Sequence, residues 1–182
     1  MPEGRAEVLI PKRPRRRPVD EFENEIIDIR RVSKVTKGGR NLKFRVTLVV
    51  GDRKGHVGVG LGNTTEIPLA IQQAIRDAKK NMITVNMTGG TLPHEVIGKF
   101  KAGNVLLKPA HPGTGIIAGV TVGAICRLAG VKDVLTKSLG TTNPLTLSKA
   151  AIQGLSQLRS REEVDRLRGR VAKAREESKN EA

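Results

Sequence analysis

Apolar and polar positions alternate most clearly in the first third of the chain. Between residues 42 and 48, apolar side chains are separated by Lys43, Arg45 and Thr47. A period of two predicts a strand with one apolar face and one basic face. We therefore expect strands across residues 26–62, with a turn at residues 51–55 and a return strand that begins at His56.

The period lengthens after residue 64. Thr65 offers a hydroxyl cap and Pro68 an early proline, which together favour a helix start. Six apolar residues then fall on one helical face, namely Ile67, Ile71, Ala74, Ile75, Ala78 and Met82. Strands packed against one amphipathic helix predict a small α+β domain.

A second pattern begins beyond Gly89 and Gly90. It begins with strand-like runs at 95–100 and 104–108, followed by a glycine-rich loop at 109–115. An apolar helix over 118–129, closed by Gly130, comes next. A strand over 131–137 and a core helix over 145–158 complete the pattern. The expected fold class is α+β with two small domains, the second of an α/β or α+β type. The expected boundaries are a disordered basic arm at 1–21, domains at 22–89 and 90–160, and a charged tail at 161–182 that is an exposed helix or frayed.

Charge points to the partner. The chain carries 33 Lys and Arg against 18 Asp and Glu, a formal charge of +15. Such an excess favours nucleic acid, because each neutralised phosphate releases counterions. There is no Trp or Tyr and only three Phe, so stacking platforms for single-stranded bases are scarce and structured RNA fits better. DNA stays open on charge alone.

No spanning segment or secretory signal is visible, so no membrane is expected. The single Cys126 indicates a reduced, cytosolic compartment.

Residues 30–54 form the densest basic stretch, with nine Lys and Arg against Asp52 alone. Two glycines let the backbone turn tightly and expose N–H groups, while Lys and Arg supply phosphate contacts. The alternative is an ordinary solvated hairpin loop. The candidate RNA-binding residues are Arg30, Arg31, Ser33, Lys34, Lys37, Gly38, Gly39, Arg40, Lys43, Arg45, Arg53 and Lys54.

Catalytic and metal patterns are absent from the sequence. The three His are scattered, Cys126 lies in an apolar run typical of a core residue, and no Ser/His/Asp signature occurs. The glycines at 58–62 and 113–119 resemble phosphate-binding loops, but the first lacks the third fingerprint glycine and the second lacks the Gly-Lys-Ser/Thr ending. Close backbone packing is the favoured interpretation of both. We expect no cofactor, no metal site and no catalytic residue.

The motifs also occur in a specific order. They comprise Arg31-Val32-Ser33-Lys34 with Lys37-Gly38-Gly39-Arg40, Val49-Val50-Gly51-Asp52 with Gly55, Glu66-Ile67-Pro68-Leu69-Ala70-Ile71, Ala78-Lys79-Lys80-Asn81-Met82-Ile83, Gly90-Thr91-Leu92-Pro93-His94, Leu107-Lys108-Pro109-Ala110, residues 113–119, Ala129-Gly130-Val131, residues 133–140 and Asn143-Pro144. Over residues 26–158 the chain resembles the "S-five" family of bacterial small-subunit ribosomal proteins.

The resemblance implies a first domain like a double-stranded-RNA-binding domain and a second, two-layer domain of a βαβ type that some small-molecule kinases also use. It implies binding to small-subunit ribosomal RNA in the cytoplasmic ribosome, with ribosomal proteins four and eight as neighbours and the messenger-RNA entrance, lined together with proteins three and four, close by. A homo-oligomer is not expected.

The resemblance also implies two residue groups. Ser33, Lys34 and Gly39 match a loop near the spectinomycin site. A segment toward ribosomal protein four, where changes affect decoding accuracy, is matched by Gly113, Thr114, Gly115, Gly119 and Gly123. The chain departs from the family at Asn63, where Lys is common, at Gly123, where Arg is usual, and at Arg127, often acidic.

Three hypotheses follow. The first is a ribosomal RNA-binding scaffold. The second is a phosphate-binding small-molecule transferase that uses residues 113–119, although the sequence offers no base or metal ligand for it. The third is a general nucleic-acid or DNA-compacting protein, which equal affinity for duplex DNA and folded RNA would favour.

Overall fold

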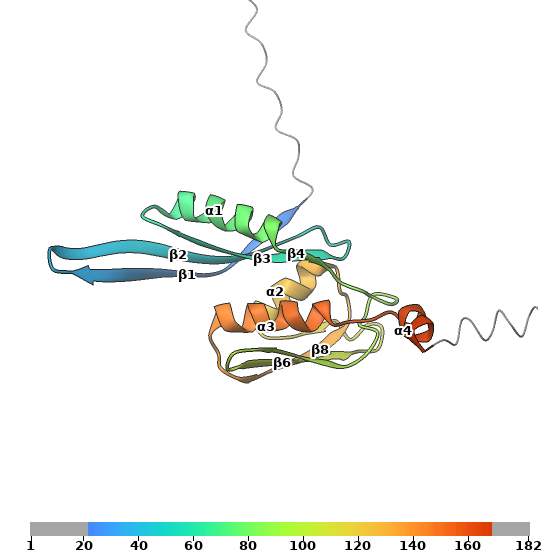
Figure 1. Ribbon diagram of the computed structural model, residues 1–182. Coiled ribbons are helices and arrows are strands. Elements are labelled where there is room, and N and C mark those ends of the chain that lie inside the picture. The colour runs from blue at the N-terminus through green and yellow to red at the C-terminus, as the bar shows by residue number, and fades with distance from the viewer. Residues whose placement is uncertain (1–21, 169–182) are drawn as a thin grey trace, which may run out of the picture.

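The structure is a computed structural model that describes residues 22–168. The predicted arm at 1–21 and the end of the charged tail, 169–182, lie outside the described residues. Two four-stranded sheets lie on either side of two helices (Figure 1). The α+β fold class with two small domains is confirmed.

The first sheet contains β1 (Glu23–Thr36), β2 (Gly39–Gly51), β3 (His56–Thr64) and β4 (Met82–Thr84) in the antiparallel order β1-β2-β3-β4. Helix α1 (Ile67–Lys80) covers one face. Strands β1 and β2 run past the end of α1 as a two-stranded arm whose turn projects from the molecule (Figure 1). We call residues 28–45 the β1–β2 arm.

Glycines let α1 lie close to the sheet. A Cβ on Gly58, Gly60 or Gly62 of β3 would overlap a backbone carbonyl of α1, at Ala78, Ala74 and Ala70 respectively. These glycines therefore serve packing, as predicted, and the dinucleotide interpretation is not needed. The predicted apolar stripe was only partly right, because the fully buried residues are the three alanines while Ile67 is 37% exposed. The predicted cap was wrong, since the N-cap residue is Glu66 rather than Thr65, and it makes no side-chain cap bond.

The second sheet contains β5 (Val96–Phe100), β6 (Gly103–Pro109), β7 (Ile116–Ile117) and β8 (Val134–Gly140) in the order β5-β6-β8-β7, with only β7 and β8 parallel. Helices α2 (Val120–Ala129) and α3 (Pro144–Ser156) cover its inner face, and a short α4 (Arg161–Leu167) follows. Gly130 ends α2 in the left-handed region (φ 90°), as predicted. The predicted strand 131–137 begins late, at Val134.

One hydrophobic core joins both domains. Val49 and Val57 of the first sheet pack in the same buried cluster as Val122 and Ile125 of α2. The thiol of Cys126 is part of this cluster, and burial raises its pKa to about 12. Cys126 is thus a core residue, as expected, and is not a nucleophile at neutral pH.

Backbone contacts strengthen this junction between the domains. The N–H groups of Arg53 and Gly55, in the β2–β3 turn, donate to the carbonyls of Leu128 and Ala129 at 2.9 and 3.0 Å. These carbonyls belong to the last turn of α2, whose C-terminal acceptors have no partner within the helix. A Cβ on Gly51 would overlap the Leu128 carbonyl, so the close approach requires glycine there.

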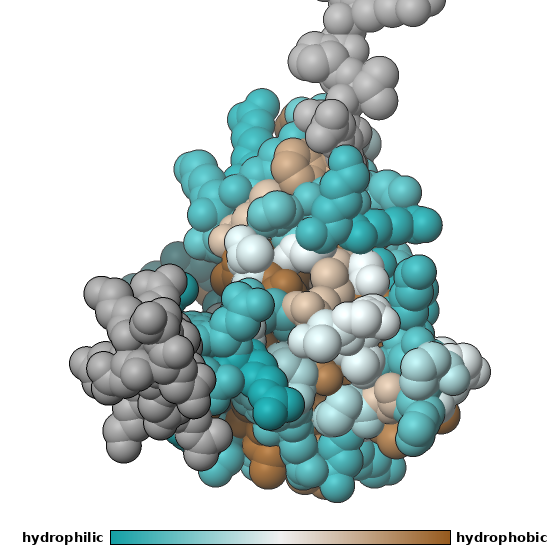
Figure 2. All heavy atoms as spheres, turned by 90° about the vertical axis from the view of Figure 1, so that its right-hand side faces the viewer, coloured by the Kyte–Doolittle hydropathy of each residue, from teal (hydrophilic) through white to brown (hydrophobic). Residues whose placement is uncertain are grey.

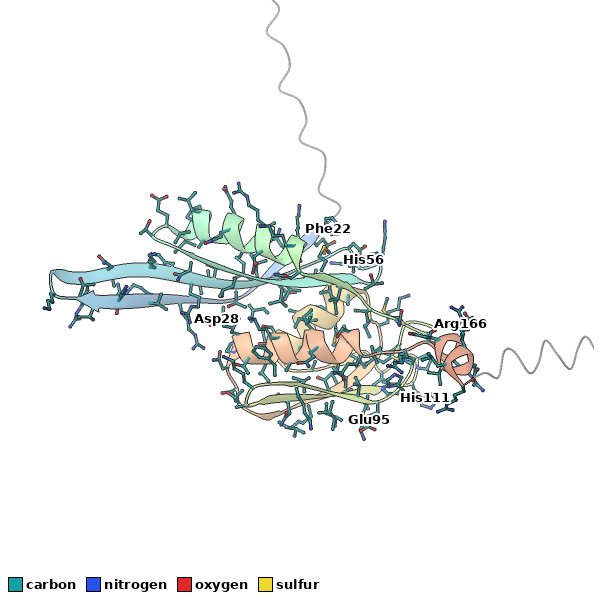
Figure 3. The ribbon with its side chains drawn as sticks, viewed as in Figure 1. Phe22, Asp28, His56, Glu95, His111 and Arg166 are labelled. Atoms are coloured by element: carbon teal, nitrogen blue, oxygen red, sulfur yellow. The ribbon has the colours of Figure 1, made fainter. Side chains whose placement is uncertain are left out.

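A carboxylate organises the same turn. Asp52 accepts hydrogen bonds from the backbone N–H groups of Lys54 and His56 at 2.7 and 3.0 Å and lies 2.7 Å from His56 Nδ1. Burial raises the pKa of Asp52, but these hydrogen bonds outweigh it and hold the pKa below its ordinary value of 3.8. Figure 3 shows His56 at the end of the sheet opposite the arm turn.

Candidate nucleic-acid interface

Strand register gives the β1–β2 arm two different faces. Val46 and Leu48 pack with α1, so Lys43 and Arg45, one position out of phase, belong to the other face. On that face Arg30 lies opposite Arg45. Asp28 shares the same face and lies below the sheet in Figure 3, which agrees with the alternation. The predicted basic face of the strand is therefore present on the side away from α1.

A groove of about 460 Å³ lies on this arm. We call it the arm groove, and it is lined by Val32, Ser33, Lys34, Asn41, Lys43, Arg45 and Asn63. Lys34 and Asn41 are register partners, as are Arg45 and Asn63. Cations and amides from three strands thus converge on one concave surface.

The cations of the arm groove lack acidic neighbours. Arg30 is paired with Asp28, with 2.6 Å between Nε and the carboxylate. Within residues 22–168, no carboxylate lies within 4.0 Å of the charged atoms of Lys34, Lys43 or Arg45. Like charges gathered without counter-charges favour an anionic partner. Asparagine amides beside them can donate to phosphate or ribose oxygens.

The remaining predicted arm residues divide between the other face and the turn. Arg31 and Arg40 are opposite Phe44 and Val35, which places them on the α1 side of the sheet. Lys37 and Gly38 form the turn, where Gly39 adopts φ 144° and its carbonyl accepts from the Thr36 hydroxyl at 3.1 Å. The antibiotic-loop candidates Ser33, Lys34 and Gly39 all lie on the arm, and the first two line its groove.

The structure does not bring Arg53 and Lys54 to the arm groove. They lie in the turn after β2, a 13-residue strand, so they are about 40 Å from the arm turn at ~3.3 Å per residue. Arg53 is also paired with Glu23, at 2.6 Å. Conversely, the candidate list omitted Asn41, although the alternation of β2 places it on the same face as Lys43.

The glycine loop before α2 is held by one acid. The Gly115 N–H donates to the Asp133 carboxylate at 2.8 Å, and the Val134 N–H donates to the Gly115 carbonyl at 3.1 Å. Gly113 and Gly115 have φ angles of 90° and 75° and open space where a Cβ would stand. The expectation of close backbone packing was therefore wrong here, because these glycines are required by backbone conformation instead. Asp133 was missed by the sequence prediction.

The protein-interface candidates differ in exposure. Gly113, Thr114 and Gly119 are exposed, whereas Gly123 is buried within α2. A Cβ on Gly123 would lie 3.4 Å from the guanidinium of Arg127. Arg127 in turn bonds Glu25 of β1 at 2.7 Å. At this position the chain thus places a cation from α2 across the domain junction.

Residues 22–168 offer neither a metal site nor a spanning helix. No group of three or more His, Cys, Asp or Glu side chains is placed to hold a metal ion. No helix in this part of the chain has the length and apolar character needed to cross a membrane.

A groove lined by cations without acidic partners is typical of nucleic-acid-binding proteins, and comparison with known proteins identifies the family. Residues 22–86 match the ribosomal protein S5 N-terminal domain and residues 98–168 match the ribosomal protein S5 C-terminal domain. The chain therefore belongs to the ribosomal protein S5 family. It is 58% identical over 149 residues to small ribosomal subunit protein uS5 of Thermotoga neapolitana, covering 82% of this chain and 84% of the relative. Small ribosomal subunit protein uS5 of Thermotoga maritima is 56% identical over 149 residues, with the same coverage of both chains.

Proposed function

We propose that this protein is a structural constituent of the small ribosomal subunit, and that it holds ribosomal RNA through the arm groove. Its relatives are small-subunit proteins, and RNA binding is the general role of the family. The ribosome is its place in the cell. The observation that carries the proposal is the groove itself, in which three cations without a carboxylate partner line one surface of a projecting arm.

The shape of the RNA follows from what the groove lacks. None of the three phenylalanines lines it, and Phe44 lies on the α1 side of β2. Without an aromatic platform the groove has no stacking surface for splayed bases. Its cations and amides instead suit phosphates and 2′-hydroxyls of an RNA that is already folded.

The test is RNA affinity as a function of salt concentration. The variant Lys34→Gln/Lys43→Gln/Arg45→Gln should lose affinity for transcribed 16S ribosomal RNA, and its slope of log affinity against log salt should fall by roughly 2.7 units, at about 0.9 per lost phosphate contact. The control variant Arg53→Gln/Lys54→Gln, which removes two charges from the distant turn, should keep the parent slope. An unchanged slope in the groove variant would remove the groove from the RNA interface.

The finer assignments belong to the same proposal. We infer that Ser33, Lys34 and Gly39 lie near the spectinomycin site, and that ribosomal proteins four and eight are neighbours near the messenger-RNA entrance. Gly113 and Thr114 are exposed, and Asp133 holds the neighbouring Gly115 through its N–H, so the loop offers an ordered surface that supports a protein contact. Gly123 would act indirectly, through Arg127, since it is buried.

The two other hypotheses have less support. A transferase would use the loop at 113–119, but the acid nearest to it, Asp133, already accepts the Gly115 N–H and is committed to loop structure. The family is one of structural ribosomal proteins. A general nucleic-acid protein would bind duplex DNA and folded RNA equally, which a competition experiment with both polymers decides.

A further inference from the structure

A second basic surface lies at the opposite end of the molecule from the arm turn. It is a hollow of about 320 Å³ beside α4, lined by Pro93, His94, Arg159, Arg161, Val164, Asp165 and Arg168. Figure 1 places α4 at the far end from the β1–β2 arm. Figure 2, which views the molecule from this end, shows largely hydrophilic residues around a paler central area. We call this surface the α4 hollow.

Helical spacing gathers the cations on the hollow side. Arg161, Val164, Asp165 and Arg168 are separated by three, one and three positions, the spacing of one helical face. Arg159, just before the helix, adds a third guanidinium. The acidic residues Glu162 and Glu163 and the cation Arg166 are absent from the lining. The hollow therefore has three arginines against one carboxylate, although the local sequence is almost balanced in charge.

His94 fixes one wall of the hollow. Its Nε2 accepts the Arg159 backbone N–H at 3.2 Å, and its Nδ1 lies 3.0 Å from the Glu95 carbonyl. Because Nε2 is an acceptor, Nδ1 carries the proton and donates to that carbonyl. Both ring nitrogens are thus satisfied by backbone, and the histidine positions the start of the Arg159–Arg168 segment.

Helix α4 makes few packing contacts with the rest of the protein. None of its residues is buried, and Leu167 is 66% exposed. Its N-terminus is capped by the Ser160 hydroxyl, which accepts the Glu163 N–H at 3.2 Å. An isolated helix of seven residues is marginal in water. A partner on its basic face would supply the missing contacts.

We infer that the α4 hollow binds the phosphate backbone of a second segment of folded RNA, remote from the segment in the arm groove. Arginine forks match phosphate oxygens bidentately. Within residues 22–168, Arg159 and Arg168 have no ion pair that would compete. A protein partner fits less well, because Pro93 and Val164 are the only apolar residues in the lining and no aromatic anchor is present. This inference rests on the proposed RNA-binding function and adds a second contact to it.

The test uses the full chain and 16S ribosomal RNA transcribed in vitro. The variant Arg159→Gln/Arg161→Gln/Arg168→Gln should lower the salt slope by roughly 2.7 units, at about 0.9 per contact. Hydroxyl-radical footprinting should show lost protection at nucleotides different from those exposed by the arm-groove variant. Arg161→Gln should lower the slope by about 0.9 units, whereas Arg166→Gln, a change of equal charge on the same helix, should leave it unchanged.

The outcomes separate this inference from the proposed function. Suppose that the triple α4 variant has the slope and footprint of the parent while the arm-groove variant is defective. That outcome would overturn this inference alone, and an acidic protein surface would then be the better partner for the hollow. Equal defects in Arg161→Gln and Arg166→Gln would also overturn it, because the effect would then be one of net charge. Parent behaviour in both the arm-groove and the α4 variants would remove both surfaces from the RNA interface, and would overturn the proposed role of the arm groove as well.

Discussion

The junction between the β2–β3 turn and α2 should make the two domains unfold together, and Gly51→Ala is the perturbation that tests it. A Cβ at this position would overlap the Leu128 carbonyl and stand 2.9 Å from the Leu128 Cβ. Real Cβ contacts are rarely that short, so the end of α2 must move away from the turn. The hydrogen bond from the Arg53 N–H to the Leu128 carbonyl, 2.9 Å long, would be strained or lost.

Gly51→Ala should lower the free energy of unfolding by a few kcal/mol. Overpacking of a tight contact costs about 1–3 kcal/mol, and loss of a backbone hydrogen bond costs about 1 kcal/mol more. A total of about 2–4 kcal/mol corresponds to a drop in Tm of about 5–15 °C for a chain of this size. Gly38→Ala is the matched control, because a Cβ there meets nothing within 4 Å, and its Tm should be that of the parent.

Circular dichroism is the suitable assay, since the chain has no Trp or Tyr for fluorescence. The parent should show a single thermal transition, because Val49 and Val122 belong to one core. Gly51→Ala should lower the midpoint of that whole transition. Two separate transitions in the parent, or a Gly51→Ala variant as stable as Gly38→Ala, would refute the reasoning.

Three further predictions concern the same region. Asp52→Asn should lower the free energy of unfolding at pH 7 by about 1–2 kcal/mol. Because the Asp52 pKa is lowered in the folded state, the stability difference between the parent and this variant should be fully present above the ordinary pKa of 3.8 and should disappear as pH falls through the lowered pKa. A difference between the two melting curves that does not depend on pH would contradict this. Cys126, with its pKa raised to about 12 by burial, should react with iodoacetamide at pH 7.5 only after denaturant is added, and fast labelling of native protein would show that the core opens there. Arg127→Ala should cost less than about 1 kcal/mol, because the Arg127 and Glu25 side chains are 52% and 38% exposed, and a Tm loss as large as that of Gly51→Ala would show a larger role.

Local patterns in the sequence predicted the elements well where burial follows a simple period. The strand with Lys43 and Arg45 and the closure of α2 by Gly130 are both present. The strand expected at 131–137 begins three residues later, at Val134. The apolar Val131 suggested a strand residue, but it is buried in the shared core before the strand begins. Lys132 next to it donates its N–H to the Gly90 carbonyl rather than entering the sheet ladder.

Long-range contacts explain what the sequence did not predict. Arg53 and Lys54 were grouped with the arm by proximity along the chain, but the length of β2 carries them to the other end of the sheet. Gly51 was assigned to a turn without any sign that α2 would lie against it. Asp133 follows an ordinary helix end, and only the fold places it under Gly115. Each of these roles depends on a partner far away in the sequence, which periodicity cannot supply.

The shared core also connects the second domain to the strands that continue into the arm. Helix α1 covers one face of the first sheet closely, because glycines of β3 lie beneath its alanines. On the other face, α2 and α3 contact the strands of the first sheet, and the arm groove lies farther along β1 and β2. Arg127 of α2 bonds Glu25 on β1, the strand that continues into the arm. If this contact helps to set the direction of the arm, Arg127→Ala should weaken binding to 16S ribosomal RNA although Arg127 lies outside the arm groove, and parent affinity in a filter-binding assay would contradict this reasoning.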